Sequence, residues 1–101
     1  MATDVVWRFG AASVANMVEM LKAYRLWGLE SQITCSLLNV YSAGEGTRAN
    51  EQSRRFYDAL SCPKAARHIE NDEGAEAHCQ VNNSSLAHMI EFDWLDEVLS
   101  Q

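Results

Sequence analysis

The run ITCSLLNVY, residues 33–41, constrains the fold of this 101-residue chain more than any other segment. It is almost continuously apolar, contains β-branched and aromatic side chains, and lies between the polar segment ESQ and the turn-forming segment SAGEG. A short apolar run with these limits is typical of a strand covered on both faces, as strands of parallel sheets are. A short buried helix is the alternative, but Gly44 and Gly46 would end it abruptly. We therefore predict a strand over residues 33–41.

Helical patterns occur on both sides of this strand and at the end of the chain. Apolar residues recur at i, i+3, i+4 and i+7 in residues 11–24, and similar spacings predict helices over residues 49–60 and 84–100. Phe92 and Trp94, at helical spacing in the last helix, are interpreted as core residues. The N-caps that we predict for the second and third helices are Asn50 and either Ser84 or Ser85.

A second, weaker strand is predicted over residues 65–70, after Pro63 has ended the middle helix. The resulting order of helix, strand, helix, strand, loop and helix predicts an α/β fold, a βαβ unit with parallel strands and flanking helices. We expect one domain over residues 1–101. Two parallel strands leave two open edges, so the chain is expected to pair with a copy of itself or with the rest of a larger sheet.

The charge balance excludes some classes of partner. Acidic residues outnumber basic ones by 14 to 8, the net charge is −6, and no run of Lys or Arg occurs. Phosphate backbones and anionic membrane surfaces both require basic patches, so we expect neither nucleic acid nor membrane as a partner. The three cysteines, an odd count without C-x-x-C spacing, and the absence of a signal-peptide pattern predict a cytoplasmic location.

Two polar side chains follow the two predicted strands. Glu45 lies in the segment SAGEG after the first strand, and His78 lies in the loop NDEGAEAHCQVNN after the second. Functional groups of open α/β sheets gather just beyond the carboxyl ends of the strands. An acid after one strand and a histidine after the next is the end of the Ser…Asp/Glu…His order of α/β-hydrolases. In that arrangement the acid fixes the imidazole tautomer, and the imidazole takes and returns a proton.

At these residues the chain resembles the C-terminal segment of α/β-hydrolases, in the branch of the dihydroxypseudooxynicotine hydrolases and the fungal heptaketide-shortening hydrolases of pigment pathways. The similarity extends over nearly the whole chain and is strongest in EGAEAHCQVNNSSLAHMIEFDWLDEVL, which resembles the histidine loop and final helix of that family. SQITCSLLNVYSAGEG resembles its strand and acid loop, and EQSRRFYDAL its next helix. The resemblance implies a helical cap-return segment over residues 1–28 and a core segment over residues 29–101, with the last two parallel strands and the final helix of the sheet.

By the same resemblance, His78 matches the catalytic histidine, Glu45 stands where the triad acid is more often Asp, and no cofactor or metal is expected. The chain departs from the family pattern at Ser36, where proline is usual, and at Ala49, where a V-P pair commonly follows the acid. The larger departure is that the 101 residues contain no G-x-S-x-G nucleophile motif. The resemblance therefore implies that this chain corresponds to the last third or so of such an enzyme.

Other interpretations of these residues stay open at this point. His78 is alternatively a polar loop residue, and Glu45 a solvated turn carboxylate. Glu73 and Glu76 near His78 would suit a divalent metal, although acidic loops are commonly just solvated. Cys79 is not expected to act as a nucleophile activated by His78, because neighbouring side chains in extended backbone point in opposite directions.

Two main functions follow. In the first, a complementary N-terminal hydrolase segment supplies the nucleophile, and the pair hydrolyses an ester or a C–C bond beside a carbonyl in a small acyl or polyketide-like substrate. In the second, the chain is a non-catalytic remnant or assembly module that forms a homo-oligomer, expected as a dimer, or packs on a partner. A weaker third option is a small-molecule binding domain that uses the acidic loop.

Overall fold

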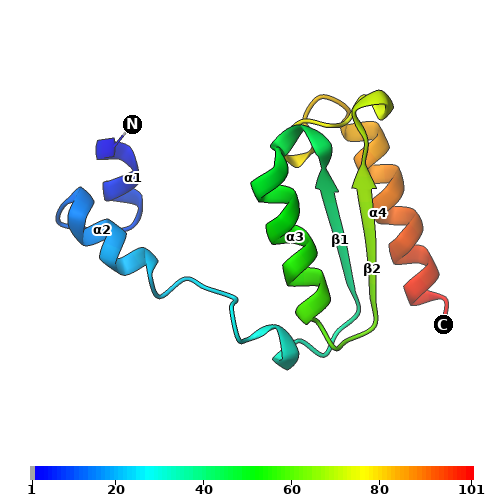
Figure 1. Ribbon diagram of the computed structural model, residues 1–101, viewed down its shortest axis with the longest axis horizontal. Coiled ribbons are helices and arrows are strands. Elements are labelled where there is room, and N and C mark those ends of the chain that lie inside the picture. The colour runs from blue at the N-terminus through cyan, green and yellow to red at the C-terminus, as the bar shows by residue number, and fades with distance from the viewer. Residues whose placement is uncertain (1) are drawn as a thin grey trace.

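The computed structural model describes residues 2–101 and shows a small α/β unit preceded by a helical arm (Figure 1). The helices and strands, in chain order, are α1 (Ala2–Arg8), α2 (Val14–Leu21), β1 (Leu37–Ser42), α3 (Thr47–Ala59), β2 (Lys64–Ile69) and α4 (Ser84–Leu99). Two short 3₁₀ turns matter for the site: η2 (Ala43–Glu45) follows β1, and η4 (His78–Gln80) lies between β2 and α4.

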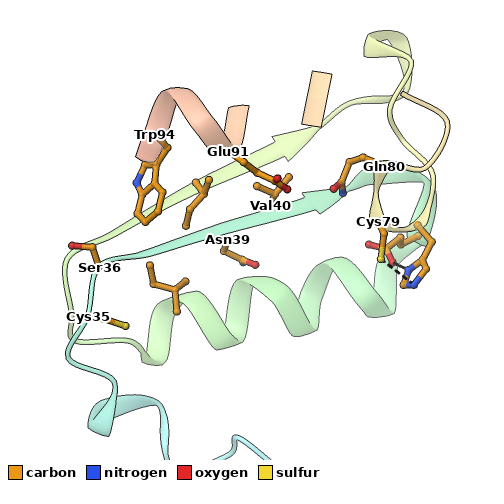
Figure 2. A pocket seen from close by; sticks show the side chains of 12 residues that line it. Cys35, Ser36, Asn39, Val40, Cys79, Gln80, Glu91 and Trp94 are labelled. Carbon is orange, nitrogen blue, oxygen red and sulfur yellow. Dashed lines mark hydrogen bonds and ion pairs between the residues drawn. The ribbon is translucent and has the colours of Figure 1, made fainter. Parts of the chain in front are cut away.

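The two strands form a parallel sheet, in register from Leu37 opposite Lys64 to Ser42 opposite Ile69. Helix α3 lies on one face of this sheet and α4 on the other (Figures 1 and 2). The side chain of Asn39 points to the α3 face, where its Nδ2 donates to the carbonyl of Ser53 at 3.2 Å. The predicted mixed α/β fold with a parallel βαβ unit is confirmed.

Strand β1 starts four residues later than predicted. Residues Glu30–Gln32 form a 3₁₀ turn, and the backbone joins the sheet only where the amide of Leu37 donates to the carbonyl of Pro63 at 3.0 Å. Pro63 has no N–H and β2 begins directly after it, so the apolar residues before Leu37 have no strand to pair with. The apolar run predicted a strand correctly, and its partner sets where that strand begins.

The N-terminal helical segment differs from the prediction of one helix over residues 11–24. The structure has two short helices, with Gly10 in left-handed geometry (φ 63°) between them. Ser13 caps α2 by accepting from the amide of Asn16 at 3.1 Å. Helix α1 has only seven residues, too few to show a clear apolar period, and an ion pair between Asp4 and Arg8 at 3.2 Å supports it.

The predicted caps of α3 and α4 are also wrong. Gly46 occupies the N-cap of α3, and Asn50 lies inside the helix with its side chain buried. Asn83 caps α4, where its Oδ1 accepts from the amide of Leu86 at 3.2 Å. Ser84 and Ser85 are the first two residues of α4, and an N-cap residue must have non-helical backbone.

The fold leaves much apolar surface exposed. The chain exposes 7312 Å², whereas a compact monomer of this mass exposes about 5,700 Å². Its radius of gyration is 16.5 Å, against about 13 Å for a compact domain of 100 residues. Part of the excess belongs to the arm of α1 and α2, which lies apart from the sheet in Figure 1. The rest reflects a sheet of two strands, which leaves the outer edge of β1 without a neighbour in residues 2–101.

Several apolar side chains of α4 are also exposed. Ala87 is buried, but Phe92 is 60% exposed and Met89 is 54% exposed. The interpretation of Phe92 as a core residue is therefore wrong, while Trp94 is half-buried. None of the helices in residues 2–101 is long and apolar enough to cross a membrane.

Candidate functional site

The structure brings Glu45 and His78 into contact. Glu45 ends the turn η2 directly after β1, and His78 begins the turn η4 in the long connection after β2. The Oε1 atom of Glu45 meets the Nδ1 atom of His78 across 33 positions of sequence. An ionised carboxylate only accepts hydrogen bonds, so Nδ1 carries the proton and Nε2 keeps a free lone pair. The acid is largely covered, with 24% of its side chain exposed, whereas the imidazole is 80% exposed.

A close backbone approach at Gly44 makes this contact possible. A Cβ atom at position 44 would overlap the carbonyl oxygen of Glu76 and crowd its carbonyl carbon. The turn that carries Glu45 therefore lies directly on the backbone two residues before His78. Only glycine fits this position without moving one of the two loops.

A buried hydrogen-bond network holds the histidine loop on the end of β1. The side chain of Ser42 is fully buried, and its Oγ accepts from Nε2 of Gln80 at 2.7 Å. The same Oγ donates to the carbonyl of Ala75 at 3.3 Å. Because Gln80 lies two residues after His78, this network fixes the loop from both sides of the imidazole.

Asn50 ties the acid loop to the same strand end. Its Nδ2 donates to the carbonyls of Ser42 at 3.1 Å and Gly46 at 2.6 Å. Both partners only accept, so the amide nitrogen must face them. The Oδ1 atom of Asn50 is buried without a hydrogen-bond partner in the described structure. Asn50 therefore does not cap α3 as predicted, but joins α3 to the end of β1.

Cys79 lies against the other side of the imidazole. Its Sγ atom is 3.3 Å from Nε2 of His78. The expectation that neighbouring side chains would point apart is wrong, because it assumed extended backbone. Cys79 has φ 53° and Gln80 has φ 54°, so two successive residues are in left-handed geometry. This turn places the side chains of His78 and Cys79 on one side of the chain.

An open groove of about 720 Å³ runs along β1 from this cluster (Figure 2). Cys79 and Gln80 lie at the carboxyl end of the strand, Val40 and Glu91 lie along it, and Trp94 lies near its start. Successive residues of β1, on both faces, line the groove, as expected of the free edge of a strand. The volume falls within the range of ordinary small-molecule sites.

The acidic residues proposed as alternative metal ligands have other partners. Glu73 pairs with Arg67, whose guanidinium is the main reason that the pKa of Glu73 lies below its usual value. Glu76 accepts from Nδ2 of Asn82 at 3.1 Å. Residues 2–101 contain no group of three His, Cys, Asp or Glu side chains placed to bind a metal ion. The loop carboxylates thus stabilise the loop itself.

Sequence reasoning missed the residues that position this site. Ser42, Gly44 and Gln80 carry no recognisable motif by themselves, and their roles depend on which backbone lies beside them. The resemblance did include the H-C-Q segment, and that was the available signal for Gln80. No protein-family model and no curated protein matches the chain.

We predict that Gly44→Ala separates the two loops and weakens the Glu45–His78 contact. Overlap with the backbone of Glu76 forces a shift, and overpacking of this kind destabilises a protein by about 1–3 kcal/mol. Urea unfolding measures the loss of stability, and the backbone amide chemical shifts of residues 75–80 report the movement of the histidine loop.

Gly46→Ala is the matched control in the same segment. Its Cβ would meet nothing within 4 Å, but its φ of 91° with ψ of 169° is a conformation nearly confined to glycine, so we expect a backbone cost of about 1–3 kcal/mol without shifts in residues 75–80. If Gly44→Ala were as stable as the wild type and left those signals unmoved, the close approach of the two loops would be wrong.

Proposed function

We propose that the chain supplies the acid–base half of a hydrolase of the α/β-hydrolase type. His78 acts as general base and then as general acid, and Glu45 orients it. The observation that carries the proposal is the contact between Glu45 and Nδ1 of His78 at the carboxyl ends of two neighbouring parallel strands. This contact leaves Nε2 free to take a proton from a nucleophile and return it to the leaving group.

The proposed nucleophile is a serine of a complementary segment, from the same polypeptide or from another one. The 101 residues contain no G-x-S-x-G motif, and within residues 2–101 no strand pairs with the outer edge of β1, which offers a place for a further strand. A strand added there parallel to β1 would bring its own carboxyl end beside η2 and η4, where the imidazole lies. The added strand would occupy the part of the groove that follows the edge of β1.

The proposed reaction is hydrolysis of an ester, or of a C–C bond beside a carbonyl, in a small acyl or polyketide-like substrate. Both reactions require a nucleophile activated by a base, followed by protonation of the leaving group. Trp94 of α4 borders the groove and offers an apolar side chain that suits an acyl chain.

An activated-ester assay tests this proposal. The chain is measured alone and together with a candidate segment that carries a G-x-S-x-G strand–turn–helix. We expect sustained turnover only for the combination, and a loss of about 10²–10⁴-fold in His78→Ala. The side chain of His78 is 80% exposed, so this substitution should leave folding unaffected.

His88→Ala is the matched control, because His88 is an exposed histidine on α4. It should retain full turnover. Turnover that survives His78→Ala, or that falls equally in His88→Ala, would rule out the assigned role of His78.

A second candidate function is assembly without catalysis, with another copy of the chain as partner. The observation that favours it is the surface of 7312 Å², about 1,600 Å² more than a compact monomer exposes. A standard interface removes about 800 Å² from each partner. A two-fold pairing through the β1 edges would extend the sheet to four strands and cover part of this excess.

Sedimentation at micromolar concentration separates this candidate from the first. The assembly function predicts a dimer that forms without any complementary segment. A charged residue on the free edge, as in Val40→Lys, should return that dimer to a monomer, since charged edges block strand pairing. A chain that sediments as a folded monomer at all concentrations would contradict self-assembly.

A further inference from the structure

We propose that Cys79, His78 and Glu45 form a thiol–imidazole–carboxylate relay, and that this relay makes Cys79 a nucleophile toward apolar acyl electrophiles. The Sγ atom of Cys79 is 3.3 Å from Nε2 of His78, and the opposite ring nitrogen contacts Glu45. The three groups stand in the order of nucleophile, base and orienting acid that activates a catalytic thiol. The chain thus holds a candidate nucleophile of its own.

The backbone at this turn explains why neighbouring residues can form such a pair. Left-handed geometry at Cys79 and Gln80 (φ 53° and 54°) is uncommon for residues other than glycine and costs energy. Two contacts hold the turn in this form: the buried bond from Gln80 to Ser42 at 2.7 Å, and the bond from the amide of Ala77 to Asn82 at 3.2 Å. The approach of thiol to imidazole is therefore built into the loop.

The protonation states of the relay agree with one another. Glu45 accepts from Nδ1–H, so Nε2 is the acceptor that faces the thiol. Transfer of the S–H proton to Nε2 produces a thiolate and an imidazolium, and Glu45 stabilises the imidazolium. The thiolate is the reactive form of cysteine.

With an ester as electrophile, each step balances. The thiolate forms a bond from sulfur to the acyl carbon, the bond from that carbon to the ester oxygen breaks, and His78 delivers the proton that it took from the thiol to the leaving oxygen. The products are a thioester at Cys79 and an alcohol. No oxidant, metal or further reactant takes part.

The surroundings of Cys79 define the class of electrophile. The thiol is exposed at one end of the groove of about 720 Å³, whose walls include Leu38, Val40 and Trp94. Glu91 adds a negative charge along the same groove (Figure 2). Apolar walls and an acidic side chain favour an uncharged, apolar acyl group over an anionic one.

This inference uses the same Glu45–His78 contact as the proposed hydrolase function but requires no complementary segment. Nε2 can serve one nucleophile at a time, either Cys79 or a serine placed beside it. Acylation of Cys79 in the chain alone and turnover in the combination are thus separate observations.

The test is acylation of the full chain by p-nitrophenyl acetate, which releases nitrophenolate as the thiol is acylated. We expect a burst of about one equivalent per chain, and peptide mass spectrometry should place the acetyl group on Cys79. Cys35, also exposed, and Cys62, buried, are internal controls in the same molecule. An ordinary thiol is only a few per cent thiolate at neutral pH, so Cys79 should react about tenfold faster than Cys35 or more.

Two variants test whether fast acylation of Cys79 depends on the relay or only on the exposure of its thiol. His78→Gln should bring the rate of Cys79 down to that of Cys35, and Glu45→Gln should lower it partway, with circular dichroism confirming the fold. Equal rates at Cys79 and Cys35 in the wild type, or a rate at Cys79 unchanged by His78→Gln, would overturn the relay. Selective acylation without turnover in the combination would leave the relay standing and overturn the serine-dependent function, and the reverse pattern would do the opposite.

Discussion

The hydrogen bond between Ser42 and Gln80 is the interaction on which the site depends. Ser42 is the last residue of β1 and is fully buried, and Gln80 is 6% exposed. Removing the Ser42 hydroxyl would leave the side-chain amide of Gln80 buried and unsatisfied, at a cost of about 1–3 kcal/mol. Through this bond the end of the sheet fixes the turn that carries His78 and Cys79, and through Asn50 it also fixes the loop after Glu45.

The carboxyl ends of the two strands are held in place, although the sheet edge and one helix beside them are uncovered. Residues 2–101 place two parallel strands between α3 and α4, which is enough to align the carboxyl ends of β1 and β2. The free edge of β1 and the exposed apolar residues of α4 remain uncovered. Both proposed functions use this uncovered edge, one by adding a nucleophile-bearing segment and the other by adding a second copy of the chain. The relay at Cys79 uses only groups already in place.

The sequence was enough to predict both strands, the helices α3 and α4 and the acid–histidine pair, but not helix α1 or the exact limits of the strands. An apolar run indicates a strand, yet the start of β1 depends on Pro63, which directly precedes the partner strand and lies 26 positions after Leu37. Glu45 and His78 were paired because residues after neighbouring parallel strands meet at one edge of a sheet. The supports of that pair, Gly44 and Ser42, act through contacts with residues about 30 positions away, and no local pattern reveals such contacts. The role of Cys79 was missed because left-handed backbone is rare outside glycine and cannot be read from the letters H-C-Q.

The tautomer of His78 shows whether Glu45 orients its imidazole. In a neutral histidine the proton usually resides on Nε2, but contact with Glu45 requires it on Nδ1. Nitrogen NMR of the histidine rings in the full chain distinguishes the two forms, with exposed His88 as the reference within the same sample. We expect that His78 carries its proton on Nδ1 in the wild type and loses this preference in Glu45→Gln. A wild-type His78 with its proton on Nε2 would contradict the assigned contact, and with it both the proposed function and the relay.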